Sequence, residues 1–164
     1  MRYLVRTSLP LVLAITSLSL RAQGSLLQDI RRDMSAVFAD EDLCDAYIAR
    51  FKEEGTSGSA LLLGYSGALR MAKGKHAFDP ISKMIHFGAG KDLLEEAIAQ
   101  DPTNVELRFL RLTIQVNVPR IMNYSDDREA DLAIVEGKLP DVKDPVIHER
   151  IERFIAKNKA EGKL

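Results

Sequence analysis

The sequence has no tryptophan and a single cysteine, Cys44, among its 164 residues. One cysteine excludes an internal disulfide and every metal site built from paired cysteines. In a folded domain a lone thiol is usually buried and inert, and a redox role is the less common alternative. The chain also lacks a His-Glu-x-x-His pair, a glycine-rich phosphate loop and a Gly-x-Ser-x-Gly elbow. These absences remove the most recognisable catalytic classes and favour a non-catalytic role.

The chain lacks an excess of either charge. It holds 23 Lys and Arg against 24 Asp and Glu, a formal net charge of −1. Nucleic-acid-binding domains carry a strongly basic face, and nothing in this composition supplies one. The charge balance therefore argues against a nucleic-acid partner.

A basic start followed by an apolar run predicts that residues 1–22 are a secretory signal peptide. Arg2 and Arg6 precede the mostly apolar stretch 9–20, and Ala22 supplies a small residue at the cut. The apolar run is too short and too often interrupted by polar residues for a membrane-spanning helix. An uncleaved N-terminal membrane anchor is the alternative to a signal peptide. Cleavage removes three arginines and leaves 20 basic against 24 acidic residues. We expect a periplasmic or secreted protein with no stable membrane span after cleavage, and one domain over 23–164.

No stretch keeps the alternation of apolar and polar residues that is typical of strands, whereas apolar residues recur at helical spacing. The clearest case is the stretch 88–112, two helices joined by an Asp-Pro-Thr-Asn turn. We expect Pro102 in the first turn of the second helix, with Asp101 or Thr103 as its cap. The whole pattern predicts an all-α domain of seven or eight helices, arranged as stacked antiparallel hairpins. The lysine-rich tail, 155–164, is predicted to fray.

Further helix starts are marked by capping residues. The predicted N-caps are Ser25, Asp40, Ser59, Asp79 and Asp144, with Ser125 or Asp126 before a helix that ends at Gly137. The helix from Ser59 to about Lys75 is apolar on most sides, so we expect it to be central. Gly64, Gly67 and Ala68 would let it approach the helices over 90–100 and 104–117 closely.

One stretch resembles the tetratricopeptide repeat. Gly90, Leu94, Ala97 and Pro102 follow the small, bulky, small and proline spacing of the second repeat helix, and Leu63-Gly64 is similar to the first helix. The resemblance implies a stack of helical hairpins that binds proteins or peptides. The segments Gly-Tyr-Ser-Gly-Ala and Glu-Leu-Arg-Phe-Leu-Arg-Leu are also similar to those of a family of short secreted bacterial proteins, a resemblance that implies no activity.

The segment 73–87 is the least repeat-like part, and its extra length makes it a place for a specific function. We expect a short helix from Pro80 that runs or bends into the next helix at Gly88. His76, Asp79 and His86 are ordinary zinc ligands, so a metal-dependent hydrolase is one alternative. Their spacing matches no ligand pattern, and the simpler interpretation is a histidine at a helix end and another on the surface or in the core.

Arg108 and Arg111 form a polar stripe with Asn104 and Gln115 on an otherwise apolar helix. A buried guanidinium needs a partner. One interpretation is structural, with carboxylates of the preceding helix as partners: Asp92, Glu95 or Glu96. The other is an anion site in a groove, because arginine binds carboxylate or phosphate bidentately. The candidate groove consists of Arg108, Arg111, Gln115, Tyr65, Lys73, Lys75 and His76.

We therefore expect a non-catalytic protein- or peptide-interaction module with no cofactor, whose groove would suit an acidic partner. A small-ligand or anion-binding protein that uses Arg108 and Arg111 is the alternative. An exposed apolar end of the hairpin stack would also allow a homodimer.

Overall fold

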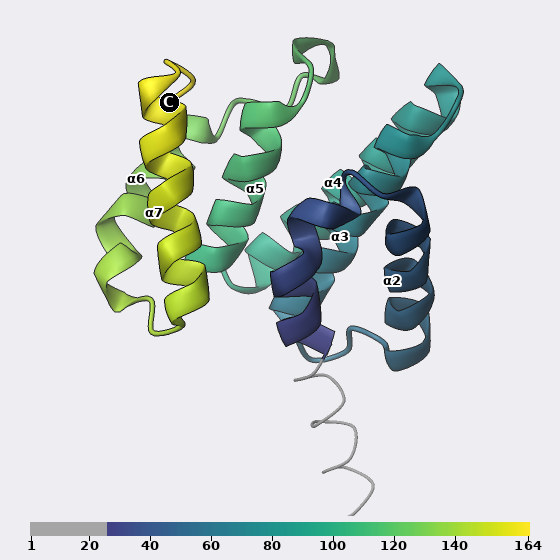
Figure 1. Ribbon diagram of the computed structural model, residues 1–164, viewed down its shortest axis with the longest axis horizontal. Helices are drawn as coiled ribbons and strands as arrows, with labels where there is room; N and C mark the ends of the chain where they lie inside the picture. The colour runs from purple at the N-terminus through teal and green to yellow at the C-terminus, as the bar shows by residue number, and fades with distance from the viewer. Residues whose placement is uncertain (1–25) are drawn as a thin grey trace, which may run out of the picture.

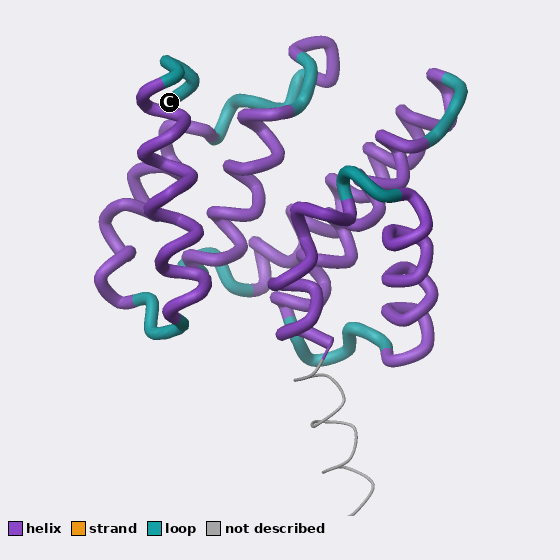
Figure 2. Tube along the Cα trace, in the orientation of Figure 1, coloured by secondary structure: helices purple, strands orange, loops and turns teal. Residues whose placement is uncertain are grey.

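A computed structural model describes residues 26–164, which form an all-α array of seven α-helices with no strand in this part of the chain (Figures 1 and 2). The predicted fold class is confirmed. The predicted signal peptide, residues 1–22, and the predicted cap at Ser25 lie outside the described residues. After a helix over residues 26–37 come α2 (Glu41–Glu54), α3 (Ala60–His76), α4 (Pro80–Gln100), α5 (Val105–Asn117), the 3-10 turn η1 (Arg120–Met122), α6 (Arg128–Lys138), the 3-10 turn η2 (Leu139–Asp141) and α7 (Pro145–Ala160).

Four of the predicted caps are confirmed. The side chains of Asp40, Ser59, Asp79 and Asp144 each accept a hydrogen bond from a backbone N–H in the first turn of their helix. Such caps stabilise a helix because its first N–H groups have no partner inside it. At α4 and α7 a proline follows the cap directly, where its missing N–H costs nothing.

Three predicted boundaries are wrong. Asn104, and neither Asp101 nor Thr103, caps α5, so Pro102 lies in the turn before the helix. At α6 the N-cap is Asp127, which makes no side-chain cap bond. The segment from residue 155 onward is not irregular throughout, because α7 continues to Ala160 and buries the side chains of Ile155 and Asn158.

Helix α4 is one continuous helix, so of the two predicted arrangements the first helix runs into the next at Gly88 without a break. It runs antiparallel to α3, and glycines let the two backbones touch. A methyl group added at Gly67 would lie 2.6 Å from the carbonyl oxygen of Gly90, and one added at Gly90 would lie 2.5 Å from that of Gly67. At Gly64 an added methyl would meet the side chain of Leu107 on α5 at 2.4 Å. The predicted close packing of α3 against both neighbours is confirmed.

The α3–α4 hairpin is long. Its helices hold 17 and 21 residues, so together they exceed a whole tetratricopeptide repeat of about 34 residues. The extra length falls in the segment 73–87, at the turn between the helices. Figure 1 shows this end of the hairpin projecting beyond the neighbouring helices.

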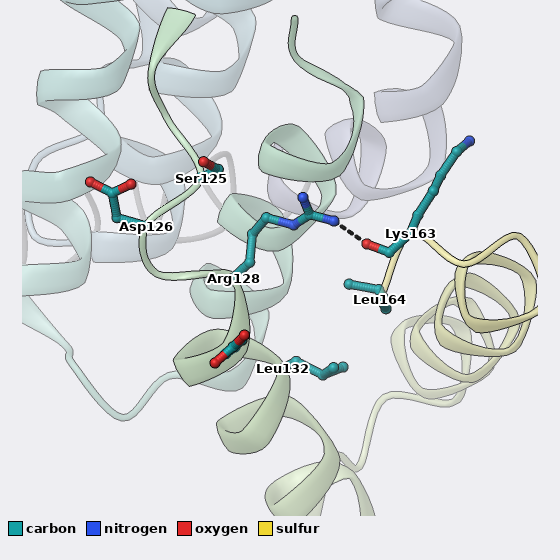
Figure 3. A pocket seen from close by; sticks show the side chains of 7 residues that line it. Ser125, Asp126, Arg128, Leu132, Lys163 and Leu164 are labelled. Atoms are coloured by element: carbon teal, nitrogen blue, oxygen red, sulfur yellow. Dashed lines mark hydrogen bonds between the residues drawn. The ribbon is translucent and has the colours of Figure 1, made fainter. Parts of the chain in front are cut away.

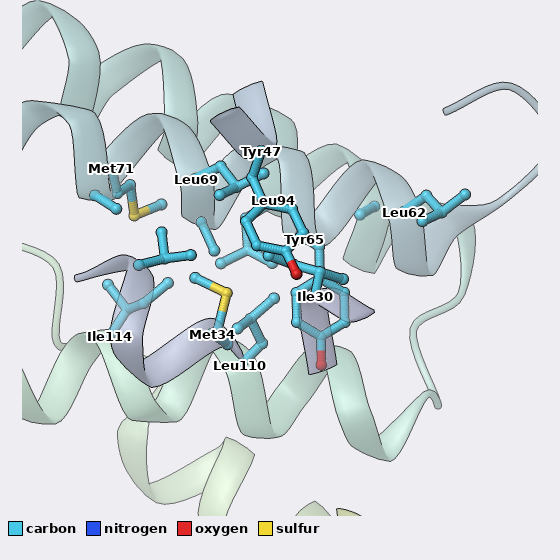
Figure 4. Packing of buried hydrophobic residues seen from close by; sticks show 14 of the residues in the cluster. Ile30, Met34, Tyr47, Leu62, Tyr65, Leu69, Met71, Leu94, Leu110 and Ile114 are labelled. Carbon is cyan, nitrogen blue, oxygen red and sulfur yellow. The ribbon is translucent and has the colours of Figure 1, made fainter. Parts of the chain in front are cut away.

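Buried apolar side chains form two clusters, and α5 contributes to both. The larger cluster joins the helix over 26–37 to α2, α3, α4 and α5 (Figure 4). The smaller one joins α5 to α6 and α7 through Phe109, Val135 and Ile151. Helix α5 reaches the first cluster with Leu107, Leu110 and Ile114 and the second with Phe109. It is therefore the shared wall between the two halves of the array.

Among the described helices, none combines the length and the continuous apolar character needed to cross a bilayer.

Candidate functional site: an apolar groove

The predicted groove residues do not meet in one groove. Arg111, with a side chain only 4% exposed, is held by the protein's own carboxylates. Its Nε and Nη2 atoms donate to the two oxygens of Asp131 at 2.6 and 2.8 Å, and Nη1 donates to Glu95 Oε2 at 2.7 Å. A third carboxylate, that of Asp127, lies 3.2 Å from Nη1. Burial alone disfavours the cation, but the hydrogen bonds and charge of Asp131 outweigh it, so the pKa of Arg111 is raised.

Arg108 and Gln115 flank this cluster. Arg108 Nη1 donates to Asp131 Oδ1 at 3.1 Å, and its other donors bind the carbonyl oxygen of Pro102. Gln115 is buried, and neither amide atom has a hydrogen-bond partner among the described residues. The structural interpretation of the arginines is the one the geometry supports. Of the three predicted carboxylates only Glu95 takes part, because the main partner, Asp131, comes from α6.

Tyr65 belongs to a second buried cluster. Its hydroxyl donates to Glu106 Oε1 at 2.7 Å, and Arg31 Nε donates to the same oxygen at 2.7 Å. Burial is the main reason that the pKa of Tyr65 is raised, and the Glu106 carboxylate adds to it. The tyrosine therefore connects α3 to α5 and to the helix over 26–37, rather than facing a ligand.

The three basic residues at the end of α3 also bind the chain itself. Lys73 Nζ donates to Glu41 at 3.0 Å and to Asp45 at 2.8 Å, both on α2. Lys75 and His76 contact backbone oxygens at the end of the helix over 26–37, at 2.7 and 3.0 Å. These contacts fix the end of α3 against its neighbours.

The metal-site alternative is not supported by the geometry. Asp79 Oδ1 accepts from the backbone N–H of Ser82 as the α4 cap. Hydrogen bonding from the Ser82 side chain, and after it from the Ser82 backbone, lowers the pKa of Asp79. His76 binds backbone, while His86 Nδ1 is buried without a partner within the described residues. No group of three potential metal ligands comes together in that part of the chain.

The structure instead places an apolar groove where the end of the helix over 26–37, the outer half of the α3–α4 hairpin, and α5 with η1 meet. Its volume is about 590 Å³, within the roughly 300–1,000 Å³ of typical ligand sites. Apolar side chains supply most of its surface. The groove residues are Ser35, Phe38, Met71, Gly74, Lys75, Lys83, Phe87, Thr113, Ile114, Asn117, Val118, Pro119 and Met122.

The charged groups of the groove are two lysines, Lys75 and Lys83, both on the hairpin extension. Lys83 is exposed, and it is absent from the ion pairs that the described lysines form. Two polar side chains of α5 are already satisfied, since the Thr113 hydroxyl and the Asn117 amide donate to backbone oxygens of their own helix. The groove can thus cover an apolar surface and attract negative charge.

A second cavity, of about 500 Å³, lies where α6 begins near the end of the chain (Figure 3). It is more polar and carries both signs of charge. Arg128, its most prominent cation, donates to the carbonyl oxygen of Lys163. Because that guanidinium is already engaged, we do not regard this cavity as the main site.

Comparisons with protein-family models, with curated proteins and with solved structures found no match for this chain.

The sequence singled out the segment 73–87, which supplies four of the thirteen groove residues, and gave no indication of the other nine. Lys75 is the only predicted site residue among the thirteen. In the sequence, Met71 and Phe87 have the spacing of ordinary core residues of a helix. Met122 lies in a turn, where no periodic spacing of apolar residues predicts its position. The extra length of 73–87 was the available signal.

Proposed function

We propose that this protein is a non-catalytic protein- or peptide-interaction module, tetratricopeptide-like in its stack of hairpins. In this proposal the groove binds an amphipathic helical segment of a partner that carries acidic residues beside its apolar face. The observation that carries the proposal is the apolar groove of about 590 Å³ with Lys75 and Lys83 on it.

The chemistry of the groove favours this kind of partner. A helix laid in a groove buries its apolar face and keeps its polar face in water. Met71 and Met122 contribute to the lining, and flexible methionine side chains adapt to irregular apolar surfaces. The two lysines would meet carboxylates on the partner helix, which adds orientation and a faster encounter more than raw affinity.

The arginine alternative is weaker for a physical reason. An external anion at Arg111 would have to displace Asp131, which is fully buried and would lose its own cation. No such exchange is needed at Lys83.

We place this function in the cell envelope or outside the cell. The support is the sequence pattern of residues 1–22, a basic start before an apolar run.

Site-specific photo-crosslinking tests the proposal. A photo-reactive phenylalanine analogue is placed at Phe87, inside the groove, and in a matched variant at Val146, an exposed residue at the start of α7. After irradiation of envelope fractions, the cross-linked segment is sequenced by mass spectrometry. We expect the Phe87 probe to capture a defined segment with acidic and apolar residues at helical spacing, and the Val146 probe not to capture it.

Substitution of Lys83 by Glu should reduce capture at Phe87, because it reverses one charge that faces the partner. Identical catches from both probes, or a basic captured segment, would contradict the proposal. A folded Lys83→Glu variant that captures the same segment equally well would contradict the role of the charge.

A further inference from the structure

The projecting end of the hairpin carries large apolar side chains in full contact with water. Phe78 is fully exposed, and Ile81, Met84 and Ile85 are exposed on the first two turns of α4. Another large apolar side chain is exposed away from the hairpin: Ile121 in η1 is 86% exposed. We call these the hairpin tip (Phe78, Ile81, Met84, Ile85) and the η1 tip (Ile121). Clustered exposed apolar residues mark interaction surfaces more often than isolated ones do.

The hairpin tip is a different surface from the groove. Lys83 and Phe87 line the groove from α4. Ile81 and Ile85 are one helical turn apart, and they fall on nearly the opposite side of the helix from Lys83 at about 100° per residue. A partner segment in the groove would therefore leave these isoleucines uncovered.

The two tips reach the same edge of the molecule. In Figure 1 the α3–α4 turn and η1 both project at the top of the view, from separate parts of the array. A flat partner would touch both at once, whereas a narrow one would touch a single tip.

The charges around the tips are mainly basic. Lys75 and Lys83 flank the hairpin tip and Arg120 precedes Ile121, all of them exposed. The only acidic residue between 74 and 88 is Asp79, which is engaged as the α4 cap. This contrasts with the whole chain, whose net charge is −1. A second copy of the chain would bring like charges together at this edge, while an anionic surface would be attracted.

We propose that the hairpin tip and the η1 tip dock together onto an anionic lipid bilayer. The apolar side chains enter the region between headgroups and acyl chains, and the positive charge of the basic side chains around the tips attracts the anionic headgroups. Apolar area and attraction to anionic lipid are the two contributions that such interfacial binding combines. The apolar contact of the two tips is independent of what the groove binds, whereas the charges of Lys75 and Lys83 serve both proposals.

Site-resolved fluorescence tests this with the full chain and vesicles of phosphatidylcholine and phosphatidylglycerol. A polarity-sensitive dye is attached to Phe78→Cys, to Ile121→Cys and to the control Val146→Cys. Cys44 is fully buried, so labelling goes to the introduced thiol. Lipids brominated on their acyl chains quench a dye only where it enters the bilayer. We expect quenching at 78 and 121 and none at 146, with weaker binding to phosphatidylcholine alone and at high salt.

An unlabelled pair of variants adds a quantitative check. Ile81→Ser/Ile121→Ser should weaken vesicle binding by about tenfold or more, because two large apolar side chains no longer leave water. Val146→Ser should leave binding unchanged.

Two results would overturn the proposal. In the first, the full chain sediments with vesicles while the dyes at 78 and 121 stay unquenched, which places the contact elsewhere. In the second, those dyes respond to protein concentration rather than to lipid, which identifies a second copy of the chain as the occupant.

Discussion

At Arg111 the sequence posed a choice between a ligand site and a structural ion pair. The side chain makes a bidentate contact with Asp131 and a third hydrogen bond with Glu95. Glu95 also accepts from the hydroxyl of Tyr124, whose pKa is raised mainly by burial. One guanidinium thus joins α4, α5 and α6. Its role is to hold helices together.

Arg111→Ala should lower the free energy of unfolding by about 3–5 kcal/mol, because it leaves the Asp131 carboxylate buried without its main cation. Arg108→Ala should cost only about 1 kcal/mol or less, since Asp131 keeps Arg111 and Arg108 is closer to solvent. Urea unfolding followed by circular dichroism measures both. Equal losses for the two variants would contradict the assignment of Arg111 as the main partner.

The double variant Arg111→Met/Asp131→Leu separates pairing from packing. The fully buried carboxylate and its main cation are then removed together, while Arg108 keeps the carbonyl oxygen of Pro102 and Glu95 keeps the hydroxyl of Tyr124, so part of the lost stability should return. If the double variant is as unstable as Arg111→Ala, shape rather than charge governs this site.

Cys44 offers a second test at the residue scale. Burial raises the pKa of its thiol to about 11, and its side chain is inaccessible. Because the thiolate is the reactive form, the folded protein should not react with a thiol reagent at pH 8, while the urea-unfolded chain reacts fully. Rapid reaction of the folded protein would show that α2 and α3 open more easily than their packing indicates.

Asp33 gives the expected pH dependence. Hydrogen bonds from Arg32 and Tyr47 lower the pKa of its carboxyl group in the folded protein. The stabilisation is present above the unfolded-state pKa, near 4, and is lost as the pH falls through the lowered value. The urea midpoint should therefore be higher for the wild type than for Asp33→Asn at pH 7, and the difference should disappear toward pH 2. A constant difference across this range would contradict the assignment.

At the scale of elements, the α3–α4 hairpin shows how tight packing depends on absent side chains. Gly67 and Gly90 let the two backbones touch, whereas a methyl group at Gly88 on the same helix would meet nothing within 4 Å. Gly88 and Gly90 therefore form a matched pair for substitution, because both lie in α4 and differ in what surrounds them.

Gly90→Ala should destabilise the protein by about 1–3 kcal/mol through overpacking against the backbone of α3. Gly88→Ala should stabilise it by up to about 1 kcal/mol, since alanine favours the helix and has room. Thermal and urea unfolding of the two variants measure the difference. A Gly90→Ala protein as stable as the wild type would mean that the helices separate without cost.

The sequence predicted most elements because their signals are local. Asp79-Pro80 and Asp144-Pro145 mark helix starts within two residues, and both are confirmed. The start of α5 was misplaced because four consecutive polar or proline residues, 101–104, offer competing caps. Only the observed bonds decide between them, because the Oδ1 atom of Asn104 accepts from the backbone N–H groups of Glu106 and Leu107. The end of α7 was missed because Asn158, polar in sequence, is buried and donates to the carbonyl of Phe154.

At the scale of the whole molecule, α5 divides the array into two apolar clusters and carries an ion cluster toward each side. Glu106 binds Arg31 from the N-terminal half, and Arg111 binds Asp131 from the C-terminal half. The sequence identified a polar stripe on α5. It did not identify the distant residues that pair with the charged side chains of α5. Those partners lie 75 and 20 residues away, a separation that no local pattern encodes.

The groove was unpredictable for the same reason. Its walls come from three separate stretches, and each lining residue is an ordinary apolar position within its own helix. What the sequence did single out was the segment 73–87, which holds the hairpin tip and contributes Gly74, Lys75, Lys83 and Phe87 to the groove.

The most direct test of groove binding uses methionine methyl NMR, because the described methionines sample distinct places. Met71 and Met122 line the groove, Met34 lies in the core, and Met84 is on the outer hairpin tip. The full chain is titrated with a synthetic amphipathic helix whose polar face is acidic, and in parallel with one whose polar face is basic. The account predicts saturable shifts of the Met71 and Met122 methyl signals with the acidic peptide, little change at Met84, and weaker shifts with the basic peptide. Shifts confined to Met84, or equal responses to both peptides, would contradict it.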